Sequence, residues 1–337
     1  MRIVLQNTLV LILGILPCLV FAHKLAPEIE YAMAHGAEAE ICLKVCDDEG
    51  APVSNASVRV EFDLLPDPYS VCGKTDSNGV VVIRGKTNGN KVSFFVGKDG
   101  YYGSHKEISY VARGKECNVE NGKWQPKEDE TKIYMRPIKN PLKMSSASVR
   151  NYKFTREIAK WIGYDLEVND FIKPYGQGSV ADFEVYLDWD KVYSLASKQM
   201  GFKIKFAEQY SGYYVVPKDG ISEFGTPYSA VAKAPFMQEA SFYSRKEGKR
   251  QRNTFDESKC WVVRSRCKVD ENGRLVSANY SVIRYLGMSG SRDLMAGFTF
   301  CGAFNPTPND TNLEDAEVAR KSRLYYKQLL EQVDGKK

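Results

Sequence analysis

The chain has 337 residues, a formal net charge of +5, 43% hydrophobic residues and 26% charged residues. At roughly 150 residues per domain this length predicts two domains, and the hydrophobic share excludes a wholly disordered chain. The excess of 47 Lys and Arg over 42 Asp and Glu is too small for a dedicated nucleic-acid-binding protein, which concentrates basic residues on one face. We therefore expect a globular protein with no nucleic-acid partner.

The first 22 residues have the pattern of a secretory signal peptide. Arg2 gives a short positive start, Leu9 to Val20 forms an apolar run, and small or aliphatic residues precede a cleavage site after Ala22. Cys18 lacks the small preceding residue that normally accompanies a lipidated cysteine. No later apolar run is long enough to span a bilayer. The sequence thus predicts a secreted or periplasmic protein with no transmembrane anchor after cleavage.

Seven cysteines follow the leader, and an oxidising compartment permits disulfides between them. Their spacing includes no C-x-x-C pair and the chain has 3 histidines, so a structural zinc site is not predicted. We expect one to three structural bridges, with at least one cysteine outside them because the number is odd. The candidates are Cys42, Cys46, Cys72, Cys117, Cys260, Cys267 and Cys301.

In chain order, residues 23–37 lack a clear pattern and predict an extended lead-in. From residues 41–45 onwards apolar and polar residues alternate, and this period of two predicts strands. Tight turns at 47–52 and 75–79 separate such segments, and the Asn-Gly pair in the second turn suits positive φ. The pattern ends in a closing strand at 132–136.

Residues 38–136 together resemble a known family. The motifs that carry the resemblance are Asp47-x-x-Gly50-x-Pro52-Val53, Thr75-Asp76-x-x-Gly79, and a Gly100-Tyr101 pair that follows an alternating strand. They are similar to the carboxypeptidase-regulatory-like, or transthyretin-like, β-sandwich domain, and bacterial Ig-like repeats share the same turns. The resemblance implies a seven-stranded sandwich that serves as an accessory, adhesive or spacer module. It carries no catalytic residues to this chain.

Residues 137–149, with two prolines and three serines, predict a linker to a second β domain at 150–337. Within that domain, residues 259–269 and 274–285 predict a hairpin across the turn 270–273. This half of the chain resembles secreted bacterial β-proteins to which no activity is attached.

Helical spacing dominates only near the C-terminus. It predicts a helix over 312–333, with Asn312 as its cap. The predicted fold class is therefore mainly β: two antiparallel β-sandwich-like domains with a C-terminal helix.

The strongest functional pattern is an acidic strand face in the second domain. Residues 180–190 alternate, so that carboxylates face one side and apolar residues the other. Side chains two apart on a strand lie about 7 Å apart, which suits calcium binding or the paired carboxylates of a glycoside hydrolase. A solvated outer face explains the same alternation. The candidates for this site are Asp182, Glu184, Asp188 and Asp190.

A basic stretch at 245–252 carries five positive charges and one negative charge. It can bind a polyanion or an acidic membrane surface, although an exposed hairpin loop explains it equally. The absence of interleaved aromatic residues argues against nucleic acid. Alternate basic residues on the following strand (Arg264, Arg266, Lys268) can extend the patch. The candidate binding residues are Arg245, Lys249, Arg250 and Arg252.

Catalytic patterns are nearly absent. Residues 287–290 read Gly-Met-Ser-Gly, and Ser291 stands where a nucleophile elbow requires glycine. His23 and His35 fall in the lead-in and His105 in the first domain, which leaves little acid–base or metal chemistry. No glycine-rich phosphate loop precedes a helix. We predict neither enzymatic activity nor a cofactor.

Tyrosines near turns are the remaining binding candidates. The chain has 20 Tyr, and such rings either anchor ligands and interfaces or, because Tyr favours strands, pack in the core. Those at turns are Tyr101, Tyr102, Tyr210, Tyr213 and Tyr214.

These observations predict a non-catalytic binding or structural protein of the cell envelope, with a glycan or an envelope protein as its partner. Two alternatives stay open. One is a carbohydrate-active hydrolase that uses carboxylates of the second domain, and the other is a polyanion-binding protein that uses the 245–252 loop.

Overall fold

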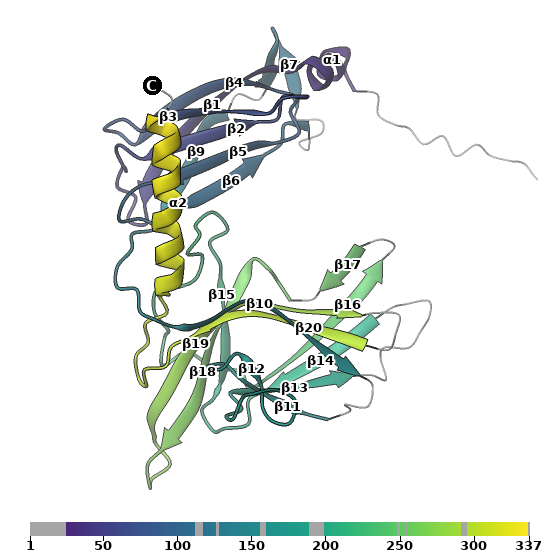
Figure 1. The fold of residues 1–337 in the computed structure, drawn as a ribbon, viewed down its shortest axis with the longest axis vertical. Coiled ribbons are helices and arrows are strands. Elements are labelled where there is room, and N and C mark those ends of the chain that lie inside the picture. Colours follow the sequence, from purple (N-terminus) through teal and green to yellow (C-terminus); the bar gives the residue numbers. More distant parts are fainter. Residues whose placement is uncertain are drawn as a thin grey trace, which may run out of the picture.

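The computed structural model describes residues 25–111, 117–125, 128–155, 160–188, 199–247, 250–253, 255–290 and 295–335. The predicted signal peptide lies outside these residues. The described chain forms two β-lobes and two helices, α1 (Pro27–His35) and α2 (Ala316–Asp334), as Figure 1 shows. The prediction of a mainly β fold with a C-terminal helix is therefore confirmed.

Two sheets pack face to face in the first lobe. One has the strand order β4–β1–β8–β7 with β9 also on β1, and its strands are β1 (Ala37–Asp47), β4 (Val80–Thr87), β7 (Asn118–Glu120), β8 (Lys123–Gln125) and β9 (Glu128–Met135). The other has the order β3–β2–β5–β6, and its strands are β2 (Ser57–Phe62), β3 (Tyr69–Lys74), β5 (Val92–Gly97) and β6 (Ser104–Ile108).

Strand β9 departs from a purely antiparallel sandwich because it runs parallel to β1. Neighbours joined by a hairpin are antiparallel, whereas parallel pairing requires the chain to cross over. One edge of β1 pairs with β4, and the chain reaches the other edge from β6 of the opposite sheet through β7 and β8, the second of which also pairs parallel with β1. Alternation of apolar residues predicts strands but carries no information about their direction.

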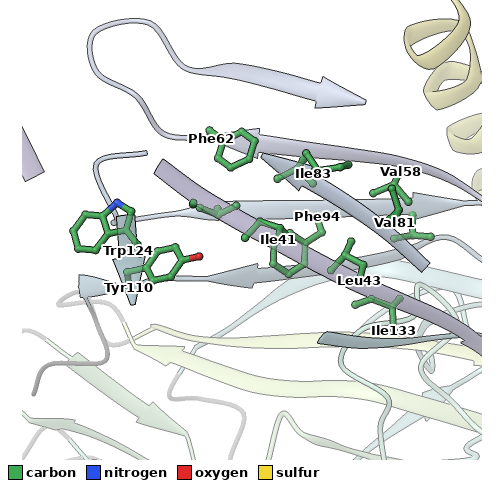
Figure 2. Close-up of a cluster of buried hydrophobic side chains, with 14 of the residues drawn as sticks. Ile41, Leu43, Val58, Phe62, Val81, Ile83, Phe94, Tyr110, Trp124 and Ile133 are labelled. Atoms are coloured by element: carbon green, nitrogen blue, oxygen red, sulfur yellow. The ribbon is translucent and has the colours of Figure 1, made fainter. Parts of the chain in front are cut away.

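The core of the first lobe lies between these sheets, as Figure 2 shows. Ile41 and Leu43 of β1 are fully buried, as the period of two predicts, and they face Val58 of β2. Burying each such side chain contributes roughly 1.5–3 kcal/mol. Trp124 and Tyr110 also belong to this core; their rings stack with centroids 5.5 Å apart, and the Trp124 indole N–H donates to the carbonyl of Thr87.

The second lobe also consists of two sheets, and both of them are antiparallel. One has the order β10–β20–β19–β18–β15, and its strands are β10 (Ser145–Thr155), β15 (Gly212–Pro217), β18 (Lys259–Val269), β19 (Leu275–Gly290) and β20 (Met295–Phe304). The other has the order β12–β11–β13–β14–β16–β17, and its strands are β11 (Ile162–Asp165), β12 (Asp170–Phe171), β13 (Phe183–Asp188), β14 (Gln199–Lys205), β16 (Glu239–Glu247) and β17 (Arg250–Asn253). A largely aromatic core fills the space between them.

Helix α2 belongs to the end of the chain but packs on the first lobe, across β2 and β5 (Figure 1). It begins at Ala316 rather than at residue 312, because Asp315 supplies the cap by accepting a hydrogen bond from the Glu317 N–H. Among the described residues no helix is both long and apolar enough to span a bilayer.

The predicted linker is ordered by the residues before α2. The carboxylate of Glu314, which is 1% exposed, accepts hydrogen bonds from the Tyr102 hydroxyl and from the amides of Lys139 and Asn140. The last part of the predicted linker is the start of β10. Buried hydrogen bonds therefore connect the two lobes.

Residues 27–35 form α1, which corrects the prediction of an extended lead-in. Pro27 occupies the first turn, where its missing N–H costs nothing, and Gly36 ends the helix at φ 77° with its amide donating to the Ala32 carbonyl. This proline-to-glycine frame is the sequence signal for the helix.

Candidate functional site

Asp182, the first member of the predicted acidic face, is buried, with a side chain that is 0% exposed. Its carboxylate accepts hydrogen bonds from the Ser265 hydroxyl at 2.7 Å, the Leu166 amide at 2.7 Å and Arg266 Nε at 3.0 Å. Burial raises the pKa of Asp182, and the contacts with Arg266 and Ser265 only partly oppose that rise. The carboxylate is thus held inside the lobe rather than presented to solvent.

Arg266 is the centre of this buried charge cluster. Its guanidinium also contacts Asp165 at 2.8 Å and Glu167, and it lies 4.6 Å from the ring centroid of Phe304. The pKa of Asp165 lies below its ordinary value. Burial acts to raise this pKa, but the amide hydrogen bonds from residues 168, 179 and 180 and the charge of Arg266 together outweigh the effect of burial. The arrangement fastens the loop 165–182 to β18.

The other acidic candidates do not share a site with Asp182. Glu184 is half-buried and pairs with Lys205 of β14 at 2.8 Å. Asp188 is the last residue of β13, its side chain is not described, and Asp190 lies outside the described residues. Where the structure describes the chain, no group of three or more His, Cys, Asp or Glu is placed to hold a metal ion.

The basic stretch folds as a hairpin of β16 and β17, in which Arg245 lies directly opposite Arg252. Arg250 is the first residue of β17, Lys249 lies outside the described residues, and the side chains of residues 243–253 are not described. Two of the basic residues on β18 do not extend the patch. Arg264 is only 9% exposed and donates to the carbonyls of Tyr210 and Ala232, while Arg266 is held in the buried charge cluster.

Three of the five tyrosine candidates serve in packing. Tyr102 is 0% exposed and stacks on Phe224 between the lobes, with ring centroids 4.7 Å apart. Tyr213 stacks on Trp261 in the second core at 3.7 Å. Tyr214 is half-buried, and its hydroxyl accepts a hydrogen bond from the Val231 amide. Burial raises the pKa of Tyr102, Tyr213 and Tyr214.

The remaining two tyrosines are more accessible. Tyr101 is half-buried with the ammonium of Lys98 5.7 Å from its ring centroid. Tyr210 is 37% exposed, and its hydroxyl donates to the carbonyl of Gly273 at the tip of the β18–β19 hairpin. The turn tyrosines are therefore divided between the two lobes, and three of them are used in packing, so the five do not form one exposed surface.

None of the seven cysteine candidates, all of which the structure describes, forms a disulfide. They lie on four strands and in one loop: Cys42 and Cys46 on β1, Cys72 on β3, Cys117 just before β7, Cys260 and Cys267 on β18, and Cys301 on β20. Burial raises the pKa of both Cys260 and Cys267 to about 11, so these two are poor nucleophiles at neutral pH.

A depression of about 380 Å³ lies between α1 and the β7–β8 hairpin, and we call it the α1 depression. Its walls are mostly apolar, and its lining includes Pro27, Glu28, Tyr31, Ala32, Val119 and Asn121. Tyr31 is 67% exposed, the most exposed aromatic residue among those that the structure describes. The centroids of the Tyr31 and His35 rings, which lie one turn apart on α1, are separated by 4.4 Å.

The β7–β8 hairpin is positioned by its turn. Asn121 and Gly122 both have positive φ, 52° and 74°, as a two-residue hairpin turn requires. The Gly122 carbonyl accepts a hydrogen bond from the Glu38 amide at 2.9 Å, which fixes the hairpin against the start of β1. The turn and this hydrogen bond therefore fix the position of the hairpin that forms one wall of the α1 depression.

A second, smaller depression of about 140 Å³ follows along the same elements, and we call it the β8 depression. It is lined by Glu38 and Glu40 of β1 and by Lys123, Trp124 and Gln125 of β8. Its charged groups are paired: Lys123 with Glu38 at 3.3 Å, and Arg84 with Glu40 at 2.7 Å. These ion pairs are exposed and therefore weak.

The sequence patterns do not reveal either depression. Tyr31 falls in the segment predicted as an extended lead-in, and Asn121 in a long polar loop. Two local signals were present: the Pro27-to-Gly36 helix frame, and the Asn-Gly pair at 121–122. No local signal in the sequence shows that α1 docks beside the β7–β8 hairpin.

No protein-family model matches the chain, and no curated protein matches its sequence. Among solved structures, it is similar over 31% of its length to 3-chlorocatechol 1,2-dioxygenase from Rhodococcus opacus (14% identity) and chlorocatechol 1,2-dioxygenase from Pseudomonas putida (15% identity), each at a TM-score of 0.24 and over 61% of that chain. Catechol 1,2-dioxygenase from Acinetobacter, inhibited by bound mercury, matches the same share at 12% identity and a TM-score of 0.22, over 54% of its chain. The chain thus spans less than two thirds of these enzymes, and likeness at this level establishes neither a shared overall fold nor a shared activity.

Proposed function

We propose that the chain is a non-catalytic glycan-binding protein of the cell envelope, secreted or periplasmic, and that it holds its ligand in the α1 depression. The observation that supports this most strongly is the Tyr31 ring, which is 67% exposed at the edge of an apolar depression and contacts the His35 ring. The apolar C–H face of a sugar ring stacks on such an aromatic platform. Its export follows from the signal-peptide pattern of residues 1–22.

Polar groups stand at the edge of the same depression. The Glu28 carboxylate can accept hydrogen bonds from sugar hydroxyls, and the Asn121 amide can both donate and accept them. An apolar floor with a few polar groups around it is the usual composition of a small-molecule site. The transthyretin-like sandwich that we propose for residues 38–136 would then serve as the carrier of this site.

Binding without turnover is favoured over hydrolysis by the state of Asp182. Its carboxylate is buried, and both of its oxygens accept hydrogen bonds from the surrounding protein. A glycosidase acid or base must reach the glycosidic oxygen or a water molecule. For Asp182 to reach either of them, its contacts with Arg266 and Ser265 in the buried charge cluster would have to break.

The test is co-sedimentation of the full chain with insoluble envelope and host polysaccharides, combined with an assay for new reducing ends. We expect binding without reducing ends, and at least a tenfold loss of affinity in Tyr31→Ala. Tyr134→Ala is the matched control, because Tyr134 is 45% exposed on β9 of the same lobe but lies outside the depression. Equal affinities of the two variants, or release of reducing ends, would remove the proposal.

Polyanion binding through the β16–β17 hairpin is a second candidate function. The register places Arg245 opposite Arg252, and like charges in directly opposed positions are unfavourable unless an anion lies between them. The test is elution from heparin as salt rises, with Arg245, Lys249, Arg250 and Arg252 replaced by serine. We expect earlier elution than for a control that replaces four exposed basic residues of α2: Arg320, Lys321, Arg323 and Lys327. Identical elution of the two variants would show that the chain binds heparin through general charge attraction alone, and would overturn this second candidate function.

A further inference from the structure

The floor of the α1 depression is apolar and consists of small residues. Ala32 of α1 and Ala37 of β1 are 1% and 5% exposed, and both belong to the core of the first lobe. Val119 of β7 packs against the same core. Helix α1 and strand β7 lie side by side (Figure 1), and the short side chains of the floor leave space between the helix and the β7–β8 hairpin.

Backbone groups along this floor are already paired within the protein. The Ala32 carbonyl accepts a hydrogen bond from the Gly36 amide at 2.8 Å, and the Gly122 carbonyl accepts one from the Glu38 amide at 2.9 Å. A ligand hydroxyl that presses against the floor would therefore lose its hydrogen bonds to water and regain none from these groups. A methyl group in the same place would gain apolar contact.

The rim of the depression, in contrast, offers polar groups on both sides. Glu28 and Tyr31 lie one turn apart on α1, and Asn121 lies at the turn of the facing hairpin. The side chains of Glu28 and Asn121 have no hydrogen-bond or ion-pair partner among the described residues. Because the Asn121 amide both donates and accepts hydrogen bonds, it is complementary to an amide group of a ligand.

The charge of the lining narrows the class of sugar further. Glu28 carries the only charge among the described residues that line the α1 depression. No lysine or arginine among them compensates the carboxylate or sulfate of an acidic sugar, which Glu28 would repel. A single exposed carboxylate also selects weakly for an ammonium group, since such pairs contribute little in water. The lining therefore favours an uncharged sugar.

We propose that the ligand of the α1 depression is an N-acetylated amino sugar within an oligosaccharide. The sugar ring stacks on Tyr31, the acetyl methyl group lies on the floor at Ala32 and Ala37, and the acetamido group pairs with the Asn121 amide. This inference rests on the proposed glycan-binding function and specifies its substrate class. Stacking on Tyr31 is available to any pyranose, so the floor and Asn121 supply the selection for the acetamido group.

The experiment titrates the full chain at pH 7 with three β1,4-linked tetrasaccharides: the N-acetylglucosamine tetramer, the glucosamine tetramer and the glucose tetramer. We expect the N-acetylglucosamine tetramer to bind at least about tenfold more tightly than either of the others, because only its acetyl groups fit the apolar floor. Raising the salt concentration should leave its affinity unchanged, since the interaction involves an uncharged ligand.

Two conservative variants test the two parts of the selection. Asn121→Asp removes the amide donor at a position whose left-handed φ aspartate tolerates, and Val119→Thr places a hydroxyl on the floor without changing the shape of the side chain. Each should reduce the advantage of the N-acetylglucosamine tetramer over the glucose tetramer several-fold. The matched controls are Asn118→Asp and Val82→Thr, at exposed positions of the same lobe that do not line the depression.

The outcomes separate this inference from the proposed function. Equal affinities for the N-acetylglucosamine and glucose tetramers, both lost in Tyr31→Ala, overturn the acetamido preference and support glycan binding. Tightest binding of the glucosamine tetramer overturns the inference as well, because it shows selection by charge. An N-acetyl preference that persists in both Asn121→Asp and Val119→Thr overturns the placement of the acetamido group. If no tetramer binds, the inference fails, and the proposed function fails with it only if no polysaccharide co-sediments with the chain.

Discussion

Arg266 lies among three carboxylates at a point where β18 is irregular, and its backbone has the left-handed φ of 52°. Asp165 and Asp182 have side chains that are 2% and 0% exposed, so both depend on this one guanidinium for charge compensation. Removing one member of a buried ion pair is costly because the partner remains buried and uncompensated.

We therefore predict that Arg266→Ala lowers the free energy of unfolding by about 3 kcal/mol or more, measured by chemical denaturation. The control Arg274→Ala removes an exposed arginine from the adjacent hairpin turn and should change it by less than about 0.5 kcal/mol. Equal effects of the two substitutions would contradict the role of the cluster.

The same substitution has a predicted pH dependence. Without Arg266, the pKa of Asp182 rises further above that of the unfolded chain, because burial already raises it and the contacts with Arg266 are the largest effects that oppose the rise. A carboxyl group with a raised folded-state pKa destabilises the fold while it is ionised, and the penalty disappears as pH falls and it binds a proton. The difference in unfolding free energy between wild type and Arg266→Ala should therefore be smaller at pH 5 than at pH 7.

At the scale of elements, the packing of α2 depends on a small residue beneath it. Leu329 is 2% exposed, and a side chain at Gly97 of β5 would meet both Leu329 and Tyr326. The glycine thus lets the helix approach the sheet closely.

We expect Leu329→Ala to cost about 2–5 kcal/mol of unfolding free energy, as large-to-small changes in a core do. Leu324→Ala is the matched control on the same helix, because Leu324 is 49% exposed, and it should have little effect. Thermal denaturation of the two variants decides the point: similar melting temperatures would show that α2 does not contribute to the stability of the first lobe.

Local patterns in the sequence predict the elements well where each has its own signal. The hairpin of β18 and β19 forms around the predicted turn, with Gly273 at φ 74°. The C-terminal helix also forms, and its start differs by a few residues because Asp315, not Asn312, supplies the cap. The sequence prediction misses α1, because residues 23–37 show no clear periodicity and only the proline-to-glycine frame marks the helix.

The site could not be predicted in the same way, because its residues meet only in the folded chain. The alternating pattern places Asp182 on the same face as Glu184, yet Asp182 is buried in the lobe, where it contacts Arg266, 84 residues later in the chain. Tyr31 becomes a candidate only when α1 docks beside β7. Periodicity along the sequence identifies which residues can share a face of a strand. It does not identify a distant partner, such as Arg266, that draws one of those residues into the core.

At the scale of the whole molecule, the two lobes are joined through Glu314. Its buried carboxylate accepts three hydrogen bonds, from Tyr102 and from the amides of residues 139 and 140. Tyr102 and Phe224 add apolar contact at the same junction. The segment between the lobes is consequently part of the folded structure.

We predict that limited proteolysis leaves the segment 137–144 intact in the wild type and cleaves it in Glu314→Ala. The substitution leaves a buried hydroxyl and two amides without their acceptor, at a cost of about 1–3 kcal/mol for each group that water cannot reach. Glu317→Ala, at an exposed position of the first turn of α2, serves as the control. Cleavage of the wild type at this segment would show that the junction is open.

The location of the ligand on the first lobe is tested most directly by hydrogen–deuterium exchange of the full chain, with and without a saturating soluble fragment of a polysaccharide that co-sediments with it. Slower exchange is predicted in residues 27–37 and 119–122, which contain the lining of the α1 depression, and in no segment of the second lobe. Slower exchange confined to the β16–β17 or β18–β19 hairpin, or unchanged exchange in both lining segments, would contradict the assignment of the binding site.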